Sequence, residues 1–276
     1  MISITARIPN IAWNEGFDRH WFDNDPVATH AFNALSFLFP QAERFFIEAA
    51  REVVRDTNIA FEPALTLAVK EFVTQEAAHT AQHNKYNSIL VAQGYKNVVH
   101  DAIEKLQIIS RKIFSPLTRL ALVCGYEHYT AILGNFVLSN PELFRKASPQ
   151  MALVWGWHAA EETEHKSVCF DLYQAAGGGW LCRSLVFMLI SLDFVVMFGR
   201  NYLYLLHRDG CFNIAQLPKT IIQFSRFFFG RTGVVWHLIG YGVHYLSPWF
   251  HPWRQNNQAE LATWMADNQQ HLRKVA

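Results

Sequence analysis

The sequence predicts an all-α protein that is built on a four-helix bundle, with additional helices at its C-terminal end. Three observations support this fold class. Long segments carry apolar residues at helical spacing, prolines stand where several of them begin, and no segment of useful length alternates as a strand does. Hydrophobic residues make up 51% of the 276 positions, so the chain can form a large core and is not mainly disordered.

Two helices are predicted in the first third of the chain. The first is expected to begin at Pro40, whose fixed φ suits the first helical position, and to end near Asp56. The second is opened by Pro63 and runs to about Gln93, where Gly94 ends it.

The segments on either side of these helices are less regular. Residues 1–25 are mixed and aromatic and are expected to form an ordered arm. Residues 98 to 138 form a third helical region, in which Pro116 marks a start, a break or a kink.

The predicted bundle ends at a run of three glycines. Pro141 opens a short piece, and Pro149 opens a long helix that ends at Gly177-Gly178-Gly179. We therefore predict a bundle domain with its arm over residues 1–177 and an apolar helical extension over residues 178–276, packed on the bundle.

Two Glu-x-x-His pairs, Glu76-Ala-Ala-His79 and Glu162-Thr-Glu-His165, lie on predicted helices. Residues three apart share a helix face, so each pair directs a carboxylate and an imidazole at the same place. A bundle with two such pairs, and one further Glu from each of two other helices, has the ligand set of a carboxylate-bridged two-metal centre.

The two further carboxylates can be chosen by helix face. Glu43 shares its stripe with apolar residues, whereas Glu48 and Glu52 lie with arginines on a face expected to be solvated. Glu127 has small and apolar residues at helical spacing, and Glu104 lies among charged residues typical of a surface. We therefore expect Glu43 and Glu127 to complete the site.

The order of these residues is nearly symmetric, because 84 residues separate Glu43 from Glu127 and 86 separate Glu76 from Glu162. The predicted metal ligands are Glu43, Glu76, His79, Glu127, Glu162 and His165. Four buried carboxylates would be costly without cations. The expected cofactor is a pair of metal ions, Fe/Fe first, with Mn/Fe or another divalent pair as alternatives.

Four neighbouring residues have open roles. His83 is an extra ligand, a proton shuttle or a core histidine, and His158 is similarly ambiguous. Glu161 could orient a ligand through a hydrogen bond. Tyr86 either lines the site or is an interior aromatic residue. His83 and Tyr86 are our candidates for proton or electron delivery.

Composition limits the partners and the compartment. A net charge of +1 gives no electrostatic footprint for nucleic acid. The N-terminus has no basic segment followed by an apolar run, so no secretory signal is visible. The four cysteines have no CxxC spacing and are expected to be reduced, as in a cytoplasmic protein.

The C-terminal third is strongly apolar. Residues 180–206 are long enough to cross a bilayer, although Asp193 near the centre makes a lipid-facing span unfavourable. Three interpretations remain: a helix buried on the bundle, a membrane-docking surface formed with residues 224–250, or a true span. The segment would also suit the roof of a channel for an apolar substrate or a homodimer interface. A polar helix over about 256–273 closes the chain.

The chain resembles the ferritin-like family described as predicted metal-dependent hydrolases, over most of its length from about residue 5 to about residue 260. The resemblance rests on Pro40–Phe46, Gln75–Asn87, Glu127-His128 and Trp157–Lys166. More distantly, the ligand order is similar to that of the ribonucleotide reductase small subunit, fatty-acyl desaturases and aldehyde-deformylating oxygenase. That similarity implies the same six metal ligands. His83 and His158 are extra imidazoles that the usual pattern of these proteins lacks.

The expected function is a di-iron oxidase or oxygenase that uses O₂ and an electron donor on a hydrophobic small molecule or lipid-like substrate. The alternative is a two-metal hydrolase, as the family description states. Iron storage or metal sensing is a further alternative, which the apolar C-terminal third does not favour. The expected localisation is cytoplasmic, with membrane contact through that third.

Overall fold

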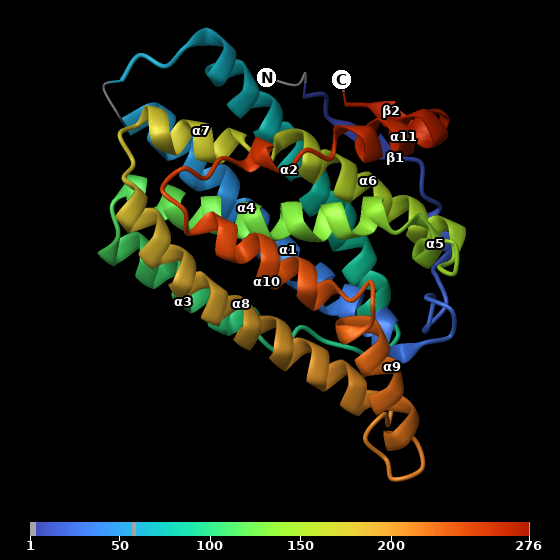
Figure 1. Ribbon diagram of the computed structural model, residues 1–276. Coiled ribbons are helices and arrows are strands. Elements are labelled where there is room, and N and C mark those ends of the chain that lie inside the picture. The colour runs from blue at the N-terminus through green and yellow to red at the C-terminus, as the bar shows by residue number, and fades with distance from the viewer. Residues whose placement is uncertain (1–3, 57–58, 276) are drawn as a thin grey trace.

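The computed structural model describes residues 4–56 and 59–275, which are helical apart from loops and one two-stranded sheet (Figure 1). Residues 1–3 of the predicted arm lie outside this description. The helices are α1 (Pro26–Asp56), α2 (Pro63–Ala92), α3 (His100–Ile113), α4 (Pro116–Ser139), α5 (Pro141–Phe144), α6 (Pro149–His165), α7 (Val168–Ala175), α8 (Trp180–Arg208), α9 (Leu217–Phe229), α10 (Val234–Tyr245) and α11 (Gln258–Asn268). The strands are β1 (Arg7–Pro9) and β2 (Leu272–Lys274), and short 3-10 helices are η1 (Trp13–Glu15), η2 (Pro252–Arg254) and η3 (Gln269–His271). The all-α prediction is confirmed.

Four helices, α1, α2, α4 and α6, form the bundle that holds the candidate site. Helix α1 packs against α2 and α4, and α4 packs along α6. Figure 1 shows α4 running through the middle of the molecule, with α6 on one side and α10 and α8 on the other. This arrangement is compatible with the ferritin-like bundle that the sequence suggested.

The first bundle helix begins at Pro26, so the predicted start at Pro40 was wrong. An interior proline leaves the carbonyl four residues earlier without a helical donor. Here the side-chain amide of Asn87 on α2 donates to the Ser36 carbonyl at 2.8 Å and replaces the missing bond. Asp25, which accepts from the Val27 backbone N–H at 2.8 Å, precedes Pro26 as a local start signal.

Of the three interpretations of Pro116, a helix start is confirmed, whereas the helix predicted from Pro149 differs from the structure. The third region divides at Pro116, where Ser115 caps α4 by accepting from the Thr118 backbone N–H at 3.2 Å. The long helix predicted from Pro149 is broken after His165 into α6 and α7.

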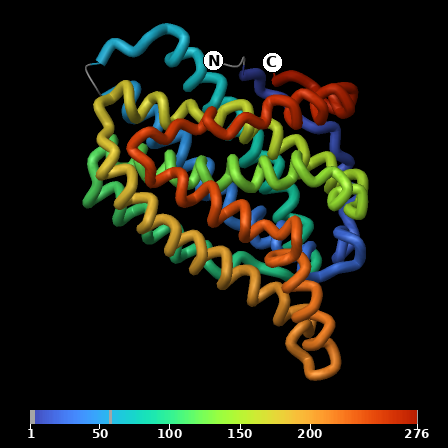
Figure 2. The backbone as a smooth tube through the Cα atoms, in the orientation of Figure 1, coloured from blue at the N-terminus to red at the C-terminus, as the bar shows by residue number. Residues whose placement is uncertain are grey.

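The chain ends were not predicted as strands. The C-terminal helix ends at Asn268 instead of near Arg273, and β2 pairs antiparallel with β1, Arg7 opposite Lys274. Three-residue strands are too short to show an alternating pattern. Figure 2 shows the two ends of the chain close together above the bundle.

The C-terminal helices cover the bundle. Helix α8 packs against α4 and α1, α10 against α4, α9 against α1, and α11 against α6 and α4. Gly177 has φ +83°, a conformation that glycine adopts without strain, and it turns the chain towards α8. The division into two domains at this point stays a prediction.

Candidate metal centre

The four bundle helices bring the six predicted ligands together in the interior. Glu43 comes from α1, Glu76 and His79 from α2, Glu127 from α4, and Glu162 and His165 from α6. Each of these six residues is at most 2% exposed. Glu43 was chosen over Glu48 and Glu52 because it shares a helix face with apolar residues. That face of α1 is the one that packs inside the bundle.

The ligating atoms form overlapping groups. Atoms of Glu76, Glu127, Glu162 and His165 all lie within 4.8 Å of one another, and so do atoms of Glu43, Glu76 and His79. A third such group joins Glu162 to His79 and His158. A fourth group joins Glu43 to His83 and His158, so the groups share members and together form one buried cluster that could hold metal ions.

His165 has one nitrogen anchored outside the cluster and one directed into it. Its Nδ1 lies 2.9 Å from Gln75 Oε1, while the Gln75 amide nitrogen donates to the Glu164 carboxylate at 2.9 Å. The amide orientation makes Gln75 Oε1 the acceptor, so His165 Nδ1 carries the proton. His165 Nε2 then lies among Glu76, Glu127 and Glu162 at distances of 3.2, 3.4 and 3.3 Å.

His79 is oriented in the same way by Glu161. His79 Nε2 lies 3.1 Å from Glu161 Oε2, and the other oxygen of Glu161 accepts from the Arg7 backbone N–H at 2.7 Å. The Nδ1 atom of His79 makes no hydrogen bond and faces Glu76 and Glu162 at 3.7 and 3.5 Å. A carboxylate that holds the outer nitrogen of an imidazole is the usual partner of a metal-ligating histidine. Strand β1 thus positions a candidate ligand on α2.

A hydrogen-bonded chain determines the tautomer of His158. Ser36 Oγ donates to Asn87 Oδ1 at 2.8 Å, so it can only accept from His83 Nδ1, which is 2.9 Å away. Neutral His83 then accepts at Nε2 from His158 Nδ1, also at 2.9 Å. The remaining nitrogen of His158, Nε2, has no proton and lies 3.0 Å from Glu162 Oε1.

Two acceptors at such a distance repel each other unless a positive charge lies between them. Burial and the neighbouring His79 lower the pKa of His158 to about 4, so a proton is not held there at neutral pH. A metal cation satisfies this geometry, and His158 joins the candidate ligands.

The carboxylates themselves lack partners. Both oxygens of Glu76, both of Glu127 and Oε1 of Glu43 are buried without a hydrogen bond, although Thr80 donates to the other oxygen of Glu43 at 2.8 Å. Among the described residues, no lysine or arginine pairs with the four clustered glutamates. Unpaired buried carboxylates are unfavourable, so this donor set fits two cations.

Without cations the cluster must hold protons. Burial, together with Glu76, raises the pKa of Glu43 well above its ordinary value, and burial with Glu162 does the same for Glu127. Burial alone would lower the pKa of His79, but hydrogen bonds to surrounding carboxylates raise it well above 6.5. Cation binding would therefore release protons from these groups.

Tyr86 is buried beside His83 and forms no hydrogen bond with the clustered carboxylates. Its hydroxyl donates to Asn33 Oδ1 at 2.7 Å, and its ring centroid is 6.0 Å from that of His83. Burial raises its pKa, so it is a neutral phenol. Its role in proton or electron delivery, like that of His83, stays a prediction.

Sequence reasoning missed several residues that hold the ligands in place. They are Arg7, Ser36, Gln75, Thr80 and Asn87. Gln75 and Thr80 adjoin ligands on α2, so their proximity was a usable signal. Arg7 and Ser36 gave none, because both meet the site only through tertiary packing.

The fold and this site define an all-α protein whose buried glutamate and histidine side chains can hold metal ions. A comparison with protein families then places the chain: residues 5–256 match the model of the family described as predicted metal-dependent hydrolase, and the chain belongs to that family. Searches of curated proteins and of solved structures found no match. The resemblance drawn from the sequence is confirmed at the level of this family.

Proposed function

We propose that this protein is a two-metal hydrolase that cleaves an uncharged ester or amide carrying an apolar chain. The observation that carries the proposal is the convergence of four carboxylates and three imidazole nitrogens, those of His79, His158 and His165, in the bundle interior. The family description supports a metal-dependent hydrolase.

The protein residues divide into those that bind and those that position. Glu76, Glu127, Glu162 and His165 would hold one cation, and Glu43, His79 and His158, with Glu76 or Glu162, would hold the other. Bound cations supply Lewis acidity, which polarises a carbonyl group and makes water a stronger acid. His83 keeps the proton of His158 on Nδ1, and Phe39, whose ring stacks on His158 at 4.7 Å, helps to keep bulk water out.

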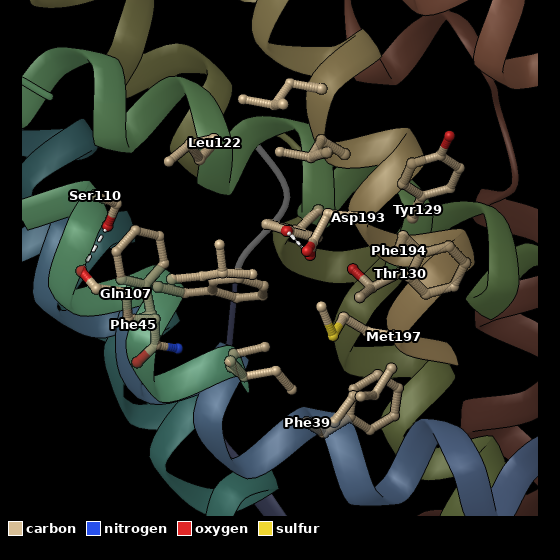
Figure 3. A pocket seen from close by; sticks show the side chains of 18 of the residues that line it. Phe39, Phe45, Gln107, Ser110, Leu122, Tyr129, Thr130, Asp193, Phe194 and Met197 are labelled. Carbon is tan, nitrogen blue, oxygen red and sulfur yellow. Dashed lines mark hydrogen bonds between the residues drawn. The ribbon is translucent and has the colours of Figure 1, made fainter. Parts of the chain in front are cut away.

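The substrate class follows from two neighbouring cavities. The larger, of about 490 Å³, is lined almost wholly by apolar side chains and reaches His158 of the site. The smaller, of about 210 Å³, is shown in Figure 3 between Leu122, Phe45 and Met197. Neither is lined by a lysine or arginine, which a phosphoester would require, so an acyl or alkyl chain is the better fit.

A second candidate is an O₂-dependent oxidase or oxygenase with the same two cations. It is favoured by the burial of the site, since reactive oxygen chemistry needs exclusion of water, and by the repeated order of one Glu followed by a Glu-x-x-His pair. The apolar cavities suit either reaction.

One reconstitution experiment separates the two. Protein stripped of metal is loaded with Fe(II), Mn(II) or Zn(II) and given chromogenic esters of increasing chain length, without O₂ and then with it. Hydrolysis that needs metal but not O₂, and that improves with chain length, supports the hydrolase. No hydrolysis with any metal, together with O₂ consumption by the Fe(II) form, would establish the second candidate instead.

The matched controls are Glu162→Gln in the cluster and Glu142→Gln on the surface. The first should lose metal and activity, and the second should retain both, because Glu142 is 76% exposed and pairs only with Arg145.

A further inference from the structure

The outer face of α8 is apolar over several turns. The side chains that it leaves exposed between Trp180 and Gly199 are Trp180, Leu181, Leu185, Met188, Leu189, Leu192, Val195 and Val196. Leu192 and Val195 are 66% and 65% exposed. By length and composition α8 is the one helix in the described ranges that could cross a membrane.

Neighbouring helices extend this apolar surface. Exposed residues include Leu106, Ile109 and Ile113 of α3, Ile221, Ile222 and Phe229 of α9, and Trp236, Ile239 and Val243 of α10. Leu106 of α3 and Leu189 of α8 line the same cavity, and Figure 1 shows α9 beyond the end of α8. We call the exposed apolar residues of these four helices the α8 face. Exposed apolar side chains in such number are typical of an interaction site.

The exposed charges of the segment from Trp180 to Trp249 are of one sign, whereas α3 carries both signs, with Asp101 and Glu104 beside Lys105 and Lys112. The segment from Trp180 to Trp249 contains two acidic residues, and both have partners: Asp193 accepts from the Tyr126 hydroxyl at 2.6 Å, and Asp209 pairs with His30 at 2.8 Å. The exposed cations of the same segment are Arg200, Arg208, Lys219, Arg226 and Arg231. None of the five forms an ion pair within the described residues.

Helix α9 shows the combination most clearly. Arg226 lies four residues after Ile222 and three before Phe229, so a cation and two exposed apolar side chains share one side of the helix. Apolar residues beside lysine and arginine are typical of helices that lie in the interface of an anionic bilayer.

The alternatives are less favourable. A symmetric dimer would place each copy's cations near those of the other, with no exposed acidic residue in the segment to pair with them. A true span is opposed by the inner side of α8, where Arg183 donates to the Ser247 carbonyl at 2.8 Å and Asn201 to Asn97 at 3.1 Å. These bonds hold the helix to the protein along one side.

The two cavities open on this same face. Leu106 and Leu189, both exposed, line the smaller cavity, and Val195, Leu203 and Ile221, also exposed, line the larger. Four residues, Phe39, Thr130, Leu133 and Phe194, line both, and three of them are labelled in Figure 3. An apolar chain could thus pass from the face to His158 without meeting water.

We propose that the α8 face docks on the surface of an anionic lipid bilayer, and that the apolar chain of the substrate enters the cavities directly from that bilayer. The docking stands on the face and its charges alone, whereas the entry of substrate rests on the proposed function.

Vesicle co-sedimentation tests the docking. The wild-type protein is expected to bind vesicles of phosphatidylcholine with phosphatidylglycerol more tightly than vesicles of phosphatidylcholine alone, and the difference should shrink with salt. Leu192→Glu should weaken binding at least about tenfold, since a charge replaces a leucine that docking would bury in the bilayer. Leu67→Glu on α2, where the leucine is 58% exposed, is the matched control and should bind as the wild type does.

The same co-sedimentation assay tests the role of the positive charges. The double variant Lys219→Glu/Arg226→Glu should lose the preference for anionic vesicles. Wild-type protein that binds neither kind of vesicle overturns the proposal. If Leu192→Glu instead abolishes a concentration-dependent dimer seen by sedimentation velocity, the face is an interface between copies, and the proposal is also overturned.

Failure of the docking and failure of the proposed function remain distinguishable. A short, water-soluble ester is assayed with wild-type protein and Leu192→Glu, neither needing a membrane. Hydrolysis without vesicle binding rejects the docking alone. Vesicle binding without hydrolysis rejects the proposed function and the entry of substrate, and leaves the docking in place.

Discussion

In most proteins charged side chains lie at the surface and apolar ones in the interior. Helix α6 departs from this by burying ionisable side chains, and α8 by exposing apolar ones. Helix α6 buries His158, Glu161, Glu162, Glu164 and His165, each at most 6% exposed, whereas α8 leaves a stripe of leucine and valine in contact with solvent. Buried charge and contiguous exposed apolar surface are both unusual. Each makes sense with a ligand that the polypeptide itself does not supply: cations in the first case and, as we propose, lipid in the second.

Removal of cations is expected to have the largest effect, because the buried glutamates of the cluster must then take up protons and lose their partners. At ligand concentrations far above Kd, bound cations should stabilise the protein by about 4 kcal/mol. Thermal unfolding before and after chelation, with metal content measured by elemental analysis, checks this. An unchanged Tm in protein shown to have lost its metal would mean that the buried ionisable side chains of α6 do not depend on cations.

Asp209 offers a contrast, since donors of the protein itself reach its carboxylate, Arg19 among them at 3.2 Å. His20, His30 and Tyr95 hydrogen-bond to its carboxylate and, despite burial, hold its pKa well below 3.8. Because the folded-state pKa is depressed, this stability is present above pH 3.8 and is lost as the pH falls below it.

Asp209→Asn should therefore cost about 1–3 kcal/mol at neutral pH and reduce the acid sensitivity of unfolding. Urea unfolding at several pH values measures this. The loss should be the same with and without chelator, and a chelator-dependent loss would show that Asp209 is itself part of a metal site.

A substitution at His83 tests whether α6 binds cations through a correctly oriented His158, and not only because its ionisable side chains are buried. His83→Phe removes the acceptor that keeps the proton of His158 on Nδ1, and metal affinity should fall about 10–100-fold. Competition with a coloured chelator gives the affinity. Tyr86→Phe, which removes a hydroxyl that donates to Asn33 and touches no candidate ligand, should leave the metal affinity unchanged. Equal affinities in all three proteins would remove His158 from the ligand set.

Leu192→Glu is expected to have the smallest effect on folding. The side chain is already exposed, so the free energy of unfolding should change by no more than about 0.5 kcal/mol. Chemical denaturation in the absence of vesicles measures it. A clearly larger loss would mean that the α8 face contributes to the fold of the isolated chain, which would break the comparison on the α8 side.

Some of the site could be predicted because helix geometry is local. The spacing of Glu76 to His79 and of Glu162 to His165 places each pair on one face wherever the helices lie. The apolar neighbours of Glu43 and Glu127 likewise indicate an inward face before any packing is known.

The start of α1 could not be read in the same way. Pro40 has the local signature of a helix start, and only Asn87, which lies on another helix and donates to the Ser36 carbonyl, makes it an interior residue.

The sequence by itself determined the all-α class, the two Glu-x-x-His pairs and the apolar character of α8, because these depend on the order of residues along one helix. The tertiary structure decided which nitrogen of His79, His158 and His165 faces the cluster, since that depends on partners from Glu161, His83 and Gln75. It also decided which side of α8 stays exposed, because hydropathy is a property of the segment, whereas exposure depends on what packs against it.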